Sequence, residues 1–175
     1  EILDALGRTT EAQADLAAGR VALDRAIDVG LRQRSVAELQ RVAARVALRL
    51  QPATAIAEAN RTIGYFLASG SAARLSELYS IRARGYDALG DASAAHANFA
   101  QAADAFERVW QDVSEPGDRL RAFTDQRLTY RSWASLALRQ QQSDTALRIW
   151  ERGLSHTVAG FSGSVALWVL MPDGL

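Results

Sequence analysis

The sequence predicts an all-α fold of antiparallel helix pairs that ends in one short β-strand. Alanine and leucine dominate the 175 residues and proline occurs only three times, a composition that favours helices. Apolar residues recur at intervals of three and four through most of the chain, which places them along one face of each helix. Short turn signals rich in glycine, proline, serine and aspartate separate these stretches.

The chain opens with the end of one helix and a complete second helix. Residues 1–7, EILDALG, end in a glycine, a common helix stop. Thr9 or Thr10 can cap the next helix, which we expect to stop near Gly30. Its apolar face is formed by Ala12, Leu16, Gly19, Leu23 and Ile27. Because the chain starts at Glu1 inside a helix, we expect it to be a piece of a longer protein.

Residues 31–70 predict a second helix pair. The first helix runs from Leu31 to Leu50, and Pro52 opens its partner, since proline is favoured at a helix start. The partner ends in the break at residues 69–71. The apolar positions of the two helices are Leu39, Ala43 and Val46, then Ala55, Ala59, Ile63 and Phe66.

Residues 76–110 carry the clearest helix–turn–helix pattern in the chain. Gly90 is placed to adopt a positive φ at the end of one helix, and Asp91 is placed to cap the next. The two apolar stripes are Tyr79, Ala83 and Tyr86, then Ala95, Phe99, Ala102 and Phe106. We interpret these aromatic residues, together with Trp110, as core residues.

A last helix pair follows a breaker at residues 113–117. We predict a long helix from Asp118 to about Gln142, and a final helix capped by Ser143 and Asp144. The inner positions of the pair are Leu120, Phe123, Tyr130, Ala134, Ala137, Ala146, Trp150 and Gly153.

The chain changes character after His156. Residues 159–164 have the composition of a flexible linker. The apolar run at 165–171, VALWVLM, predicts a strand, and the following Pro-Asp-Gly predicts a turn. We therefore interpret residues 165–175 as the start of a following β-containing domain.

The pattern in residues 76–110 resembles the tetratricopeptide repeat, which spans about 34 residues. The residues that match its spacing are Tyr79, Ala83, Tyr86, Gly90, Ala95, Phe99 and Ala102. The resemblance implies a right-handed superhelical solenoid of degenerate repeats. The expected units are residues 1–30, 31–70, 72–112 and 117–158.

The stretch from Ile149 to Leu175 resembles the boundary in bacterial proteins where such repeats precede a CHAT domain, a caspase-like cysteine peptidase fold. The matching features are Trp150-Glu151-Arg152-Gly153 at the end of a helix, a loop, and then the strand-like ALWVL-MPDGL. The resemblance implies an adjoining catalytic domain. It places no catalytic residue in this chain, because the chain has no cysteine and His156 precedes the strand.

Composition excludes several classes of chemistry. Basic and acidic residues balance at 20 each, so the chain lacks the basic character of a nucleic-acid binder. All the basic residues are arginine, as expected for a GC-rich genome, so Schiff-base and phosphate-loop lysines are absent. The lack of cysteine excludes thiolate nucleophiles and favours a cytoplasmic protein, although a disulfide-free secreted domain is also compatible with it. No apolar run is long enough to cross a membrane.

The sequence contains no convincing catalytic or metal-binding constellation. His96 and His156 are the only histidines, and a zinc site needs further ligands. Ser155 and His156 are neighbours in sequence, which does not make a catalytic dyad. Residues 160–164, GFSGS, lack the final glycine of the G-x-S-x-G elbow. We expect no enzymatic activity, no cofactor and no metal.

The first helix of each stacked pair would line a concave groove, where we place the candidate binding residues. These residues are Gln40, Glu77, Arg84, Asp87, Arg131 and Arg139. The arginines would favour an acidic peptide. The clamp for a C-terminal carboxylate that the resemblance suggests uses lysine and asparagine; here lysine is absent, and Asn60 and Asn98 fall on second helices. Glu77 with Arg82, and Arg84 with Asp87, are expected to form ordinary pairs along one helix.

These observations predict a non-catalytic module for protein–protein interaction and regulation. It would bind a partner peptide or restrain an adjoining CHAT-like peptidase domain of the same polypeptide. The alternative is a stand-alone scaffold or sensor in a bacterial regulatory protein with no peptidase attached.

Overall fold

The computed structural model describes residues 7–25, 29–70, 72–113 and 115–158. Seven α-helices and no strand occur in these residues, so the predicted all-α class is confirmed for the part of the chain described. The strand predicted at 165–171, with Trp168, lies outside it, as does the linker at 159–164.

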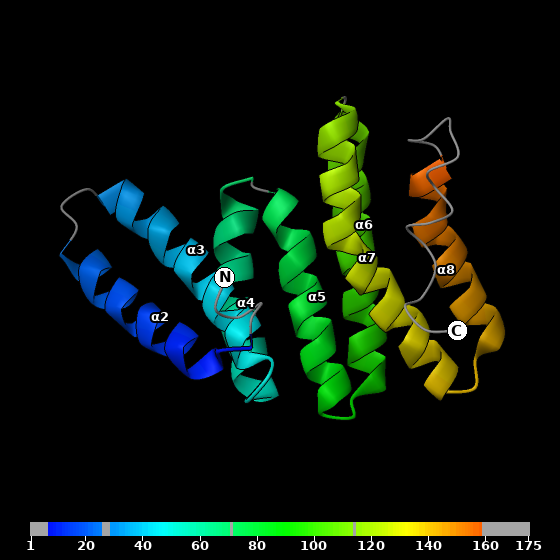
Figure 1. Cartoon of the computed structure of the whole chain (residues 1–175), viewed down its shortest axis with the longest axis horizontal. Helices are drawn as coiled ribbons and strands as arrows, with labels where there is room; N and C mark the ends of the chain where they lie inside the picture. Colours follow the sequence, from blue (N-terminus) through cyan, green and yellow to red (C-terminus); the bar gives the residue numbers. More distant parts are fainter. Residues whose placement is uncertain (1–6, 26–28, 71, 114, 159–175) are drawn as a thin grey trace. The chain divides into compact units, whose positions relative to one another are not determined.

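The helices follow one another with short connections (Figure 1). Their bounds are α2 (Thr9–Asp24), α3 (Val29–Ala47), α4 (Pro52–Ala68), α5 (Ala72–Ala88), α6 (Ala92–Asp112), α7 (Pro116–Arg139) and α8 (Ser143–Val158). The chain divides into two compact units, Glu1–Phe106 and Glu107–Leu175. Helix α6 belongs to both, because the division falls within it.

Consecutive helices of the first unit pack against each other, from α2 with α3 to α4 with α5. Their main core is built from small and large apolar side chains of four helices. Its buried members are Ala37, Ala44, Ala55, Ala59, Ile63, Phe66, Leu75, Leu78, Ile81 and Ala105. All four predicted apolar positions of α4 are buried, so that stripe is confirmed.

Helix α5 buries Ala83 of its predicted stripe, but it also buries residues outside that stripe. Tyr79 and Tyr86 are only half-buried, whereas Leu75, Leu78 and Ile81 are buried in the core. Tyr79 nevertheless packs against the core cluster as a partly buried side chain, so the prediction that both tyrosines are core residues holds only in part. Helix α5 contacts α3, α4 and α6. Contacts with three helices bury more of its surface than a single apolar stripe would cover.

The turn between α5 and α6 has the predicted geometry. Gly90 adopts φ +81°. The amide of Asp91 donates to the Tyr86 carbonyl at 3.0 Å, and the amide of Gly90 donates to the Asp87 carbonyl at 3.0 Å, which is the Schellman pattern. The Asp91 Oδ1 atom then accepts from the Ala94 amide at 3.0 Å and caps α6. On α6, Ala95, Phe99, Ala102 and Phe106 are all buried, as predicted.

Two details of the first helices differ from the prediction. Neither threonine caps α2, which begins at Thr9 with no side-chain cap; the Thr9 hydroxyl instead donates to the Gly7 carbonyl at 3.4 Å. Helix α2 ends at Asp24, and Gly30 lies in the first turn of α3 rather than at a helix stop. Glycine inside a helix is tolerated when the flanking residues sustain the hydrogen-bond ladder.

The start of α2 repeats the geometry of the α5–α6 turn. Gly7 adopts φ +73°, close to that of Gly90. Ala12 and Leu16 follow it at the spacing at which Ala95 and Phe99 follow Gly90, and all four are buried. Ala12 and Leu16 pack against Ala43 and Val46 of α3 in a second apolar cluster.

In the second unit, α7 and α8 pack against each other. Helix α7 starts at Pro116, two residues before the predicted Asp118, because proline is well suited to the first turn. It ends at Arg139, where Gln141 adopts φ +61° and replaces the glycine of a usual stop. Tyr130 is buried and its ring lies 3.0 Å from the position that a Cβ on Gly153 would occupy.

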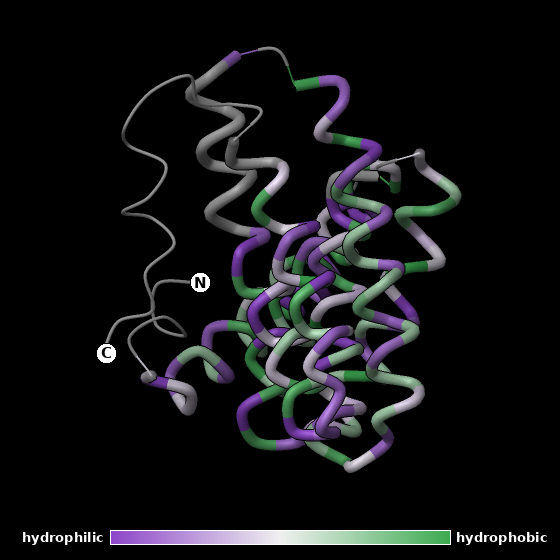
Figure 2. Tube along the Cα trace, turned by 90° about the vertical axis from the view of Figure 1, so that its right-hand side faces the viewer, coloured by the Kyte–Doolittle hydropathy of each residue, from purple (hydrophilic) through white to green (hydrophobic). Residues whose placement is uncertain are grey.

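Hydrophobic and hydrophilic residues are mixed along the helices (Figure 2). None of the helices within the described ranges is long and apolar enough to cross a membrane. Many apolar residues are buried in the core, whereas others, such as Leu31 and Leu67, are exposed.

Candidate functional site

An open hollow lies between α2 and α3 of the first unit. Its volume is about 540 Å3, which falls within the range of roughly 300–1,000 Å3 that ligand pockets occupy. Ten residues line it: Gly19, Ala22, Leu23, Leu31, Arg34, Ser35, Glu38, Leu39, Arg41 and Val42. We refer to this feature as the α2–α3 hollow.

The lining of the hollow is mainly apolar and partly exposed. Gly19 lets α2 and α3 approach closely, because a Cβ at this position would lie 3.1 Å from the Leu39 Cδ1 atom. Leu31, at the first turns of α3, keeps 62% of its surface exposed. Leu31 therefore adds an exposed apolar side chain to the apolar lining of the hollow.

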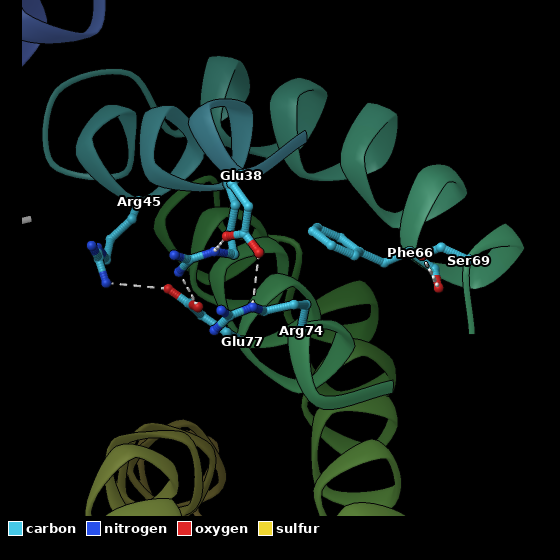
Figure 3. Close-up of polar contacts among 7 residues, drawn as sticks. Glu38, Arg45, Phe66, Ser69, Arg74 and Glu77 are labelled. Atoms are coloured by element: carbon cyan, nitrogen blue, oxygen red, sulfur yellow. Dashed lines mark hydrogen bonds and ion pairs between the residues drawn. The ribbon is translucent and has the colours of Figure 1, made fainter. Parts of the chain in front are cut away.

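Arginines and glutamates of α3 and α5 form an ion-pair network beside the hollow (Figure 3). We refer to Glu38, Arg41, Arg45, Arg74 and Glu77 as the α3–α5 network. Arg41 Nε donates to Glu38 Oε2 at 2.9 Å, and Arg41 Nη1 donates to Glu77 Oε2. Arg74 Nε donates to Glu38 Oε1 at 3.0 Å, and Arg45 Nη1 donates to Glu77 Oε1 at 3.3 Å.

Arg41 is the centre of this network because it is buried and bonded to both carboxylates. Its side chain keeps only 8% of its surface exposed, whereas Glu38 and Glu77 each keep 31%. A buried guanidinium is stable only when its donors find acceptors. The two glutamates supply these acceptors from two helices, so the network fixes α3 against α5.

The environment of Glu38 changes its acidity. Burial by itself raises the pKa of this carboxyl, but the hydrogen bond and positive charge of Arg41, with those of Arg74, outweigh burial and lower the pKa below 4.5. Glu38 therefore stays ionised to lower pH than an ordinary glutamate. The same carboxylate lines the hollow, so the wall of the hollow carries a fixed charge.

Arg34 is the cation at the rim of the hollow that makes no ion pair with a described residue. Its side chain is exposed on α3, one helical turn from both Leu31 and Glu38. The network itself carries three guanidinium groups and two carboxylates, which leaves one positive charge in excess. The hollow thus combines an apolar floor with a cationic border.

Four of the candidate residues predicted from sequence lie in the first unit. Gln40 is half-buried on α3, next to Arg41. Glu77 belongs to the network and pairs with Arg41 and Arg45 of another helix, whereas pairing with Arg82 along α5 was expected. Arg84 is exposed two turns after Glu77 on α5, and Asp87 is half-buried one turn further on.

The remaining two candidates lie in the second unit. Arg131 and Arg139 are exposed on α7. That unit has its own half-buried ion pair, in which Arg152 Nε and Nη2 donate to the Glu107 carboxylate at 2.6 and 2.8 Å. The Tyr130 hydroxyl donates to the same carboxylate at 3.3 Å.

Four charged residues of α3 were not predicted as site residues: Arg34, Glu38, Arg41 and Arg45. The sequence does indicate that these residues share one side of the helix, because residues 34, 38, 41 and 45 recur at intervals of four, three and four. Charged residues at this spacing usually indicate a solvated face. That Arg41 is buried could not be read from the spacing, because it depends on Glu77 from another helix.

Of the residues considered for catalysis, His96 lies on α6 and Ser155 on α8. His96 is half-buried on α6, and Ser155 is exposed on α8 with its hydroxyl bonded to the Arg152 carbonyl at 2.8 Å. Residues 160–164 lie outside the described ranges. Within those ranges, no group of three or more His, Asp or Glu side chains is placed to hold a metal ion.

Comparisons of the chain with known protein families, with curated proteins and with solved structures find no match. In the described ranges, the fold defines an all-helical protein with a repeat-like succession of helices.

Proposed function

We propose that this chain is a non-catalytic interaction module that binds a peptide of a partner protein in the α2–α3 hollow. The observation that supports the proposal is the combination of an exposed apolar floor with the rim cation Arg34. The peptide that fits these features carries a large apolar side chain followed closely by an acidic one. The apolar side chain would cover Leu31, and the acidic one would pair with Arg34.

The α3–α5 network supports this role because it holds the wall of the hollow in place before a peptide arrives. Glu38 and Arg41 line the hollow and are already bonded to each other and to α5. A preformed wall lowers the conformational entropy lost on binding. Gln40, Arg84 and Asp87 would extend the contact surface along α3 and α5 for a longer peptide.

We also propose that the helices are degenerate tetratricopeptide-like repeats that form a right-handed solenoid. The recurrence that supports this proposal is a glycine of positive φ followed at matching positions by a buried alanine and a large buried residue. It occurs at Gly7, Ala12 and Leu16, and again at Gly90, Ala95 and Phe99.

The peptide-binding proposal is tested by selecting binders from a random peptide library with the whole chain as bait. The affinities of selected peptides are then measured for the wild type, Leu31→Glu and Leu67→Glu. Leu67 is the matched control, because it is equally exposed on α4, at 57%, but does not line the hollow. We expect Leu31→Glu to weaken binding at least about tenfold, which corresponds to 1.4 kcal/mol, and Leu67→Glu to have no effect.

A second variant separates the apolar and the charged contributions. Arg34→Glu is expected to weaken peptides that carry an acidic residue and to leave neutral peptides unchanged. Selected peptides that bind Leu31→Glu and the wild type equally would contradict the proposal, as would a selection that yields no binders.

A further inference from the structure

Arg82 is held in one position by three neutral side chains. It extends from α5, and its Nη1 atom donates to Asn60 Oδ1 of α4 at 2.7 Å. Its Nε and Nη2 atoms donate to Asn98 Oδ1 and, at 3.0 Å, to Gln101 Oε1, both of α6. The guanidinium carbon also lies 5.1 Å from the centre of the Tyr79 ring, within the range of a cation–π contact. Side chains of three helices thus fix this cation.

No carboxylate of a described residue neutralises Arg82. Its bonds go to amide oxygens and an aromatic ring, in contrast to Arg41, Arg45 and Arg74, which are paired with glutamates. Glu58 lies two residues before Asn60, a partner of Arg82, but its carboxylate pairs with Arg61 at 3.3 Å and not with Arg82. The arrangement therefore positions a guanidinium without neutralising its charge.

The surroundings of Arg82 offer hydrogen-bond donors. A guanidinium has only donors, so all three amides must turn their oxygens toward it. The NH2 groups of Asn60 and Gln101, whose side chains are exposed, consequently face away from the arginine. Three of the five N–H groups of Arg82 are used by the amides, which leaves two.

The base of the cluster is rigid, whereas its edge is accessible. Asn98 is only 7% exposed, and its Nδ2 atom donates to the Ala94 carbonyl at 2.8 Å, which fixes the amide. Asn60 and Gln101 border the cluster on its solvent side. A fixed cation surrounded by outward donors is complementary to an anion with several acceptor oxygens.

We propose that Asn60, Arg82, Asn98 and Gln101 form a binding site for a phosphate group. Phosphate suits the cluster better than carboxylate because it brings more acceptor oxygens for the free N–H groups of Arg82, Asn60 and Gln101. The group is either free phosphate or a phosphate ester on a partner. This site shares no residue with the α2–α3 hollow, so the proposal does not depend on the proposed function.

The test is a titration of the isotopically labelled whole chain with inorganic phosphate, followed by NMR at constant ionic strength. We expect saturating shifts of the Arg82 Nε–H signal and of the Asn60 and Gln101 NH2 signals. Arg82→Gln should weaken phosphate binding about tenfold or more. Arg108→Gln is the matched control, since Arg108 is also a helix arginine and is exposed on α6; it should leave binding unchanged.

A second variant and two further ligands make the test decisive. Asn60→Ala with Gln101→Ala keeps Arg82 and its buried partner, and it should weaken phosphate binding by a smaller factor, about threefold to tenfold. A phosphoserine peptide and its unphosphorylated form, titrated in parallel, distinguish a phosphate ester from free phosphate. Equal binding by Arg82→Gln and Arg108→Gln, or acetate binding as tightly as phosphate, would overturn the proposal.

Discussion

Single glycines determine how closely the helices approach. Gly85 of α5 is buried against α4, and a Cβ there would lie 2.7 Å from Ile56 Cγ1 and 3.3 Å from the Pro52 carbonyl oxygen. Gly64 of α4 lies inside a helix as well, but a Cβ there would meet nothing within 4 Å. The two positions therefore predict opposite effects of the same substitution.

We expect Gly85→Ala to destabilise the protein by about 1–2 kcal/mol, because overpacking exceeds the gain in helix propensity. Gly64→Ala should stabilise it by up to about 1 kcal/mol, since only the propensity gain operates. Denaturant unfolding of both variants beside the wild type measures the two changes. A stabilising Gly85→Ala would show that α4 and α5 are not packed as described.

Glu38 makes stability depend on pH. Because the folded state lowers its pKa, the carboxylate contributes stability above its ordinary value of 4.5, and this contribution is lost as pH falls through the lower folded-state value. Glu38→Gln should therefore be less stable than the wild type at neutral pH, and the gap should close below pH 4.5. Unfolding free energies measured across this range test the prediction. A gap that stays constant with pH would contradict the role assigned to Arg41 and Arg74.

At this scale the sequence predicted the turn residues Gly90 and Asp91 correctly, because their effect is local. It did not predict the burial of Arg41 or the half-exposure of Tyr79 and Tyr86. Those properties depend on which helices surround α3 and α5, and a single helical stripe does not contain that information.

The α3–α5 network is the polar link between two helices that are not consecutive. A double-mutant cycle with Arg41→Met and Glu77→Gln should give a coupling energy of about 1–2 kcal/mol, since Arg41 is buried. The exposed pair Arg8–Glu11 serves as the control, and its cycle should give about 0.3 kcal/mol. Similar values for the two pairs would mean that the network does not join α3 to α5.

Helix α6 contributes the most buried aromatic side chain. Phe99 is fully buried, whereas Tyr86 of α5 is half-buried. Phe99→Ala should cost about 3–5 kcal/mol, and Tyr86→Ala should cost clearly less because part of its ring is already exposed to water. Equal costs, measured by chemical denaturation, would restore the interpretation that both aromatics belong to one core.

The order of the helices from α2 to α8 was predictable from sequence, because apolar periodicity and turn residues act within each element. Their ends were less predictable. Gly30 lies inside α3, and α7 begins at Pro116 and stops at Arg139 without a glycine. A helix often ends at a glycine, but it can also continue through one. At the end of α7, Gln141 adopts the positive φ that a glycine usually supplies.

For the whole molecule, the groove residues predicted from sequence are divided between two compact units. Gln40, Glu77, Arg84 and Asp87 belong to the first unit, and Arg131 and Arg139 belong to the second. The α2–α3 hollow was not predicted, because a hollow arises from the angle and spacing of two helices. Periodicity identifies the face that each helix buries but not how far apart the helices lie.

The most direct test of the peptide-binding proposal is hydrogen exchange of the whole chain with and without a peptide selected as above. The proposal predicts slower amide exchange in residues 19–24 and 29–42, which contain the hollow, and unchanged exchange in α7 and α8. Slower exchange confined to α7 and α8, with residues 19–24 and 29–42 unchanged, would contradict it.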